Sequence, residues 1–126
     1  MDAPRHTVII LSSGDSDGGS KATLAFSLGS TLLSAGQTAT VFLIHEGCLW
    51  ASAQAPMNLS KPDWKPVGEY INAFLDLNGK IVHCAVCDTR DKKKCGTRCG
   101  IRGRIEPGSL LDIAEAVQNG ATVISI

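Results

Sequence analysis

The chain has 126 residues, of which 44% are hydrophobic and 19% charged. This composition suits one folded domain spanning residues 1–126 and excludes a disordered or membrane-embedded chain. The net charge of zero conceals an asymmetry, because residues 84–104 hold seven of the twelve basic residues and only two of the twelve acidic ones.

The first apolar run, Val8–Leu11, is too short for a signal peptide or a membrane span. We therefore expect a cytoplasmic protein that does not contact a membrane. In that compartment the five cysteines stay reduced. Thiol chemistry or metal binding then explains them better than a disulfide framework does.

The chain opens with a strand and a helix. His6–Leu11 is a continuous apolar run typical of a strand buried on both faces of a parallel sheet. A glycine-rich turn follows, and a helix with Ser20 as its N-cap is expected to end at Gly36. Within this helix Gly29 is expected to allow close approach to the sheet. The turn resembles a phosphate-binding loop only loosely, because its lysine and serine stand in the wrong order, so a plain strand-to-helix turn is favoured.

A helix ending at glycine and a strand beginning at once is a pattern that recurs. The later strands are expected at 38–44, 80–83 and 121–126. The last helix is expected to start after its cap Ser109 and to bury Leu110 or Leu111, Ala114 and Val117. The alternation predicts an α/β fold: a three-layer, open, mainly parallel sheet with helices on both faces.

Ligands of such sheets bind outside the carboxyl ends of the strands. Three loops leave that edge, at 12–19, 45–66 and 84–107, and every cysteine lies in the last two. Cys48 lies in the first of these two and is an accessory candidate, as a relay or resolving thiol, although a lone partly buried cysteine is usually inert.

The loop 84–107 is rich in cysteine and basic residues, and its thiols admit three interpretations. Cys84, Cys87, Cys95 and Cys99 offer four soft ligands for Zn²⁺ or an iron–sulfur cluster. Alternatively, Cys84 and Cys87 form a redox dithiol. In the third interpretation, one thiolate, made more acidic by neighbours such as Arg98, accepts sulfur from a persulfide and passes it on.

The basic run at 92–94 has no interleaved aromatic residue on which a base could stack. An acidic protein partner therefore explains it better than a nucleic acid does.

The chain resembles the DsrE/DsrF/TusD-like (YchN-like) family of small sulfur-relay proteins over almost its whole length. The likeness rests on the first strand, turn and helix, on the second strand ending in His45-Glu46-Gly47, on Cys84-Ala85-Val86-Cys87, on Arg98-Cys99-Gly100-Ile101, and on the closing segment 119–124.

This resemblance implies a DsrE-like fold, homo-oligomers of three or six subunits or hetero-oligomers, and a sulfur donor or acceptor protein as partner. By position, Cys84 matches the sulfur-carrying cysteine of the family best, and Cys87 comes second. The segment 91–97 looks like an insertion, and Cys95 and Cys99 are extra thiols. The expected function is therefore a sulfur transferase-like persulfide carrier, and the alternative is a module in which four cysteines hold zinc and present a basic surface to an acidic partner.

Overall fold

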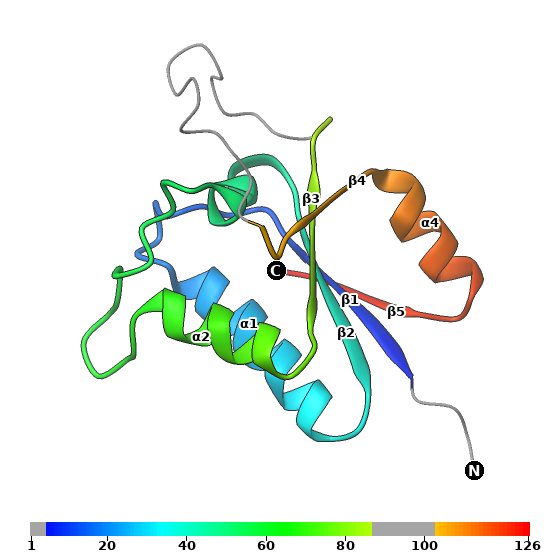
Figure 1. The fold of residues 1–126 in the computed structure, drawn as a ribbon, viewed down its shortest axis with the longest axis horizontal. Helices are drawn as coiled ribbons and strands as arrows, with labels where there is room; N and C mark the ends of the chain where they lie inside the picture. Colours follow the sequence, from blue (N-terminus) through cyan, green and yellow to red (C-terminus); the bar gives the residue numbers. More distant parts are fainter. Residues whose placement is uncertain (1–4, 87–102) are drawn as a thin grey trace.

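The computed structural model describes residues 5–86 and 103–126, and its centre is a five-stranded parallel sheet (Figure 1). The strand order is β4-β3-β2-β1-β5, so the chain adds strands on one side of β1 and returns to its other side for the last. The strands are β1 (His6–Leu11), β2 (Thr38–Leu43), β3 (Lys80–Cys84), β4 (Glu106–Gly108) and β5 (Thr122–Ser125).

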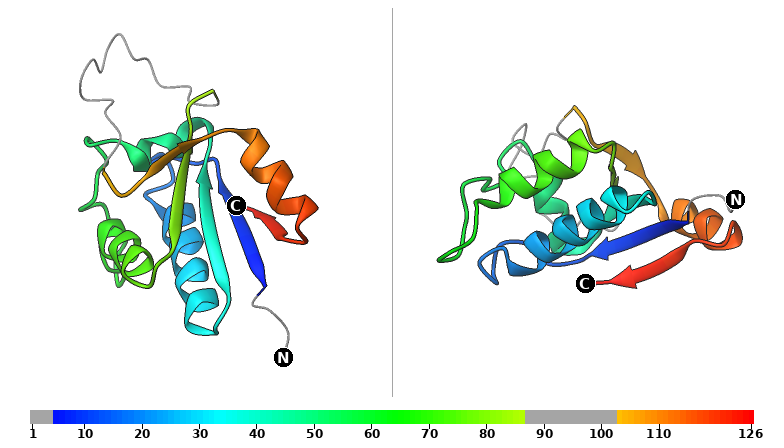
Figure 2. Two further views of the ribbon diagram at one scale, coloured as in Figure 1. Left: turned by 45° about the vertical axis from the view of Figure 1, so that its right-hand side comes forward. Right: turned by 90° about the horizontal axis from the view of Figure 1, so that it is seen from below.

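Helices cover both faces of this sheet, which confirms the predicted three-layer α/β fold (Figure 2). The helices α1 (Ser20–Ser34) and α2 (Val67–Asp76) lie on one face, and α4 (Leu110–Gln118) lies on the other. Successive residues of β3 show the consequence: Ile81 joins the core beneath α1 and α2, whereas Val82 joins the core beneath α4. A strand buried on both faces is mostly apolar, as the sequence pattern indicated, although β3 also buries His83.

The core between the sheet and the helices α1 and α2 is built around two aromatic rings. Phe26 and Phe74 meet edge to face with 5.7 Å between their centroids, and both are fully buried. The Phe74 ring also covers Gly29, where an added Cβ would lie 2.6 Å from a ring carbon. The expectation that Gly29 lets α1 approach the sheet is therefore wrong, because this glycine makes room for the aromatic ring of α2 instead.

The start of α1 also differs from the expectation. Ser20 is the first residue of the helix rather than its cap, and the cap residue is Gly19 in a left-handed conformation. The Asp17 carboxylate accepts hydrogen bonds from the backbone N–H groups of Gly19 (2.9 Å) and Lys21 (3.0 Å). An aspartate two residues before the cap residue thus satisfies amides that a helix cannot satisfy itself.

The α4 helix begins as predicted but turns a different side to the sheet. Ser109 and Asp112 form the expected capping box. The residues that pack against the sheet are Ile113 and Ala116, and no residue of α4 is fully buried. The residues predicted to be buried point away from it: Leu110, Leu111, Ala114 and Val117 are exposed.

The sequence did not predict β4. Its three residues lie inside or next to the expected loop 84–107, yet they pair with β3 in parallel, with Pro107 opposite His83. Proline has no N–H to donate and is tolerated in a sheet at an edge, which is where β4 lies. The cysteine-rich connection therefore ends earlier than expected and returns the chain to the sheet beside the strand that it left.

Candidate functional site

At the carboxyl edge of the sheet, the segment that follows β1 packs against the segment that follows β2, which in turn contacts the end of β3. After β2 the chain forms a short 3₁₀ helix, η1 (His45–Ala51). Its residue Trp50 is fully buried, and the indole N–H donates to the Ser13 carbonyl at 3.1 Å. An added Cβ at Gly47 would run into the Leu11 carbonyl, so only glycine lets η1 lie this close to β1. Cys48 and Cys84 are thereby held at a tightly packed edge.

Cys48 connects η1 to the end of β3. Its side chain is fully buried, and its thiol lies 3.5 Å from the Leu43 carbonyl and 3.7 Å from the Cys84 carbonyl. Cys48 belongs to the core beneath α1 and α2, whereas the Cys84 side chain belongs to the core beneath α4. The structure therefore places the thiol of Cys48 against the backbone of Cys84.

Cys84 is the last residue of β3 rather than the first residue of a loop. Its side chain has no exposed surface and packs with Val8, Phe42 and Val82 on the sheet face that α4 covers. A thiol enclosed by apolar groups is inert until it is uncovered. Any reaction of Cys84 with another molecule thus depends on movement of the elements above it.

Four of the six predicted site residues lie outside the described part of the chain: Cys87, Cys95, Cys99 and Arg98. Within residues 5–86 and 103–126, no three His, Cys, Asp or Glu side chains are grouped so that they could hold a metal ion. Cys84 is the single ligand of the predicted zinc site that the structure describes, and its thiol faces apolar side chains. The described residues therefore lend the zinc interpretation no support.

The glycine-rich turn after β1 behaves as the plain turn that was expected. The Asp17 carboxylate lies at the amino end of α1 and takes the amides of Gly19 and Lys21. A phosphate group would need those same N–H groups and would meet a negative charge there. This arrangement argues against a nucleotide site at the turn.

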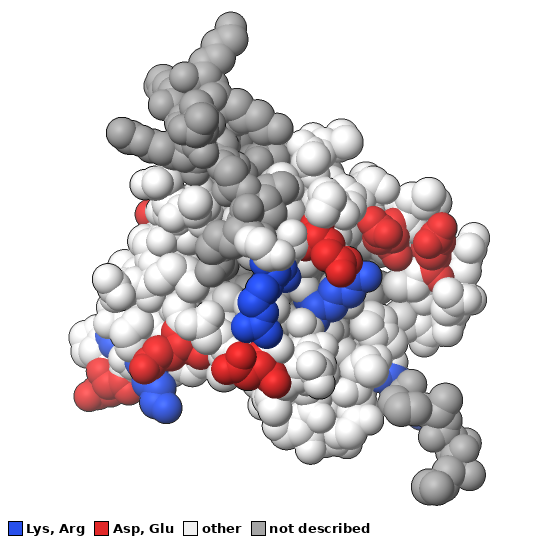
Figure 3. Space-filling view, in the orientation of Figure 1, with Lys and Arg blue, Asp and Glu red and all other residues white. Residues whose placement is uncertain are grey.

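Charges of both signs alternate near β3 and β4, whereas acidic groups gather over α4 (Figure 3). The Lys80 ammonium pairs with Glu106 at 3.2 Å, and the Arg104 guanidinium pairs with Asp76 at 3.4 Å. Both pairs are more than half exposed, so each contributes little to stability. Arg104 is also the one described member of the seven basic residues at 84–104, and it already has an acidic neighbour within the chain.

A polar pocket, which the sequence did not predict, lies between α4 and the sheet. It is a pocket of about 240 Å³ into which His6, Thr40, Lys80, Glu115 and other residues project. Burial, and in second place the charge of Lys80, hold the pKa of His6 below its ordinary value. The polar residues that line this pocket from α4 and its C-cap recur at 112, 115 and 119, a one-sided helical spacing that would have been the available signal.

None of the helices in the described ranges has the length and apolar character needed to cross a membrane.

Comparison with known proteins finds a similar structure but no similar sequence. No protein-family model matches the chain, and no curated protein sequence matches it. Among solved structures, the chain is similar to the YchN protein from E. coli, with a TM-score of 0.65 over 98% of this chain and 100% of that one. The sequences are only 12% identical, so the likeness concerns the course of the backbone. The chain therefore has the YchN-like, DsrE-type α/β fold.

Proposed function

We propose that this protein is a sulfur relay that carries a persulfide on Cys84. The observation that supports the proposal is the place of Cys84 at the carboxyl end of β3, the sheet edge at which ligands bind in open α/β folds, within a fold shared with YchN. The cytoplasm, where thiols stay reduced, is the compartment that suits this chemistry.

The transfer needs no oxidant. The Cys84 thiolate attacks the terminal sulfur of a donor persulfide, R–S–SH, so that a new S–S bond forms on Cys84 and the donor leaves as its thiolate, R–S⁻. Delivery then follows one of two routes. An acceptor thiolate takes the terminal sulfur, or Cys87 attacks the Cys84 sulfur, forms a Cys84–Cys87 disulfide and releases the terminal sulfur as sulfide. In the second route the two protein thiols are oxidised and the released sulfur is reduced, so the electrons balance.

The burial of Cys84 sets a condition on this function. The thiol is covered from the α4 side, and α4 itself contributes no fully buried residue. A helix held by so little apolar contact opens at low cost in free energy. We infer that α4 moves when a donor docks, which exposes Cys84 only in the presence of its partner.

Exposed apolar side chains on α4 and β5 support a homo-oligomer. Leu110, Leu111 and Val117 on α4 and Val123 on β5 are all more than a third exposed, and they lie on neighbouring elements. Exposed apolar side chains grouped in this way favour an interface between protein chains. A trimer or hexamer built through the α4–β5 side would cover them.

The first experiment is anaerobic incubation with a persulfide donor followed by native mass spectrometry, which reports added sulfur, bound metal and subunit number together. The wild-type chain should gain one sulfur, Cys84→Ser should gain none, and Cys48→Ser should behave as wild type. Loss in Cys87→Ser alone would move the assignment to that residue. Full transfer by both Cys84→Ser and Cys87→Ser, or one zinc per chain without a sulfur adduct, would refute the relay.

The interface is tested in the same spectrum. Leu111→Asp places a charge on the α4–β5 side and should dissociate the oligomer into monomers, because a charge buried in an apolar interface is costly. Leu24→Asp is the matched control, since Leu24 is 56% exposed on α1, against 64% for Leu111 on α4. An oligomer that survives Leu111→Asp, or that dissociates equally with Leu24→Asp, would refute this interface.

A further inference from the structure

The pocket between α4 and the sheet is small and has an apolar floor. Its floor is formed by Val8, Phe42 and Val82, which project from three adjacent strands and are at most 4% exposed. Its volume of about 240 Å³ is below the roughly 300 to 1,000 Å³ usual for drug-sized ligands. A molecule of a few heavy atoms with an apolar group would fit this space.

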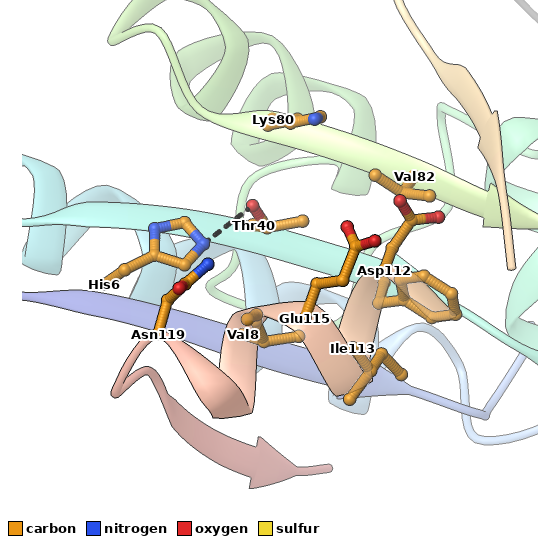
Figure 4. Close-up of a pocket in the computed structure, with 11 residues that line it drawn as sticks. His6, Val8, Thr40, Lys80, Val82, Asp112, Ile113, Glu115 and Asn119 are labelled. Carbon is orange, nitrogen blue, oxygen red and sulfur yellow. Dashed lines mark hydrogen bonds between the residues drawn. The ribbon is translucent and has the colours of Figure 1, made fainter. Parts of the chain in front are cut away.

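The rim carries charges of opposite sign on its two sides. Lys80 comes from the sheet, and Asp112 and Glu115 come from α4, one helical turn apart. Figure 4 shows the Glu115 carboxylate over the pocket with Lys80 across from it. A ligand that touches both sides therefore meets one cationic and two anionic groups.

These charged groups keep capacity for a ligand. The Lys80 ammonium gives one contact to Glu106 at 3.2 Å but has three N–H donors. The Asp112 carboxylate accepts one bond from the Ser109 backbone at 2.8 Å. Among the described residues, no hydrogen bond or ion pair engages the Glu115 side chain. Glu115 is thus the acidic group best placed to receive a cation.

The far end of the pocket is uncharged. The two ring nitrogens of His6 lie 2.6 Å from the Thr38 hydroxyl and 3.1 Å from the Thr40 hydroxyl, and Asn119 of α4 faces this end (Figure 4). Because both ring nitrogens are in hydrogen bonds, the His6 ring is held in place at this end of the pocket. The ionic contacts of a ligand would therefore be made at Lys80 and at α4.

We propose that this pocket binds a small zwitterion, an α-amino acid with an apolar side chain. Its carboxylate pairs with Lys80, its ammonium pairs with Glu115, and its side chain rests on the apolar floor. A simple anion would be repelled by the two carboxylates of α4, and a simple cation would bring no carboxylate to the Lys80 ammonium. A molecule that carries both charges meets attraction on each side.

The proposal is tested with three probes that share one apolar body. L-leucine carries both charges, 4-methylpentanoate lacks the ammonium, and 3-methylbutylamine lacks the carboxylate. Each is titrated into the wild-type protein, and amide chemical shifts are followed by NMR. L-leucine should shift resonances of α4 and of the amino-terminal halves of β1 and β3, and each truncated probe should bind about tenfold more weakly, because one charge-assisted contact is lost.

Two variants assign the contacts. Glu115→Gln should weaken L-leucine binding about tenfold and should not weaken binding of 4-methylpentanoate, because that probe has no ammonium. Lys80→Gln should weaken L-leucine binding and should not weaken binding of 3-methylbutylamine, because that probe has no carboxylate. Glu69→Gln on the surface of α2 is the matched control and should change nothing.

The proposal fails if L-leucine produces no shifts, if the shifts lie away from α4 and β3, or if a truncated probe binds as well as L-leucine. Equal effects of Glu115→Gln and Glu69→Gln would also overturn it. None of these readouts involves a cysteine, so failure of the ligand-binding proposal and failure of the sulfur-relay proposal can be told apart.

Discussion

The two faces of the sheet are packed to very different degrees. Beneath α1 and α2, large side chains such as Phe26, Trp50 and Phe74 are fully buried in one continuous core. Beneath α4 the core consists of four fully covered residues, and the helix adds only partly buried ones. The chain packs one face tightly and the other loosely, and the candidate cysteine lies under the face that is less firmly packed.

The largest expected difference between the faces comes from truncating one large side chain on each. Phe74→Ala removes a fully buried ring and should lower the free energy of unfolding by about 3 to 5 kcal/mol. Leu111→Ala removes an exposed side chain and should change the stability of the monomer by no more than about 0.5 kcal/mol. Urea denaturation of dilute protein measures both, and similar losses would contradict the comparison.

Overpacking the core beneath α1 and α2 should give the next largest change in stability. Gly29→Ala adds a methyl group that would lie 2.6 Å from the Phe74 ring, an overpacking that costs about 1 to 3 kcal/mol. The better helix propensity of alanine offsets up to about 1 kcal/mol of this cost. Ser30→Ala, one residue further along α1, is the control and should not destabilise the protein. Equal stability of the two variants would mean that the ring has room to move.

Removing one helix cap on each face should show whether Cys84 is exposed by local opening of α4 or by unfolding of the whole chain. Ser109→Ala at α4 and Asp17→Ala at α1 each remove a cap worth about 1 kcal/mol. Only Ser109→Ala should speed amide exchange in α4 and alkylation of Cys84, because the thiol lies under that helix. Mass spectrometry of alkylated peptides reports the rate, and an equal acceleration in Asp17→Ala would show that Cys84 is exposed by global unfolding.

The smallest expected effect is a pH dependence that originates beneath α4. Burial and the nearby Lys80 lower the pKa of His6 in the folded protein, so the unfolded chain binds its proton more readily. The stability contributed by neutral His6 should be complete above about pH 6.5 and should decline as the pH falls through the lower folded value. In His6→Gln this part of the slope should vanish, and an unchanged slope in urea midpoints would refute it.

The strands and the fold class were predictable because buried parallel strands are mostly apolar and rich in β-branched residues. His6–Leu11 matches β1 residue for residue, and the glycine that ends a helix marks the start of the next strand. The sequence Glu106-Pro107-Gly108 has no such signal, because an edge strand held by one neighbour needs no strand-forming residues. Pairing with β3 alone makes it a strand.

The site was predictable in position but not in environment. Cys84 was expected directly after the third strand and is the last residue of that strand, but the period of α4 could not show which of its apolar sides meets the sheet. Leu110 and Leu111 suggested the wrong side, because α4 carries apolar residues both on the side that meets the sheet and on the exposed side. Residues from His6 to Asn119 meet in the pocket only through the tertiary fold.

The edge strand β4 also limits how copies of this protein can associate. It is three residues long and contains Pro107, which has no N–H with which to pair an incoming strand. Polymerisation by strand addition is therefore blocked on the β4 side of the sheet. A copy that joins through backbone hydrogen bonds has to approach β5 instead, and two copies paired through β5 close on each other rather than extend into an open fibre.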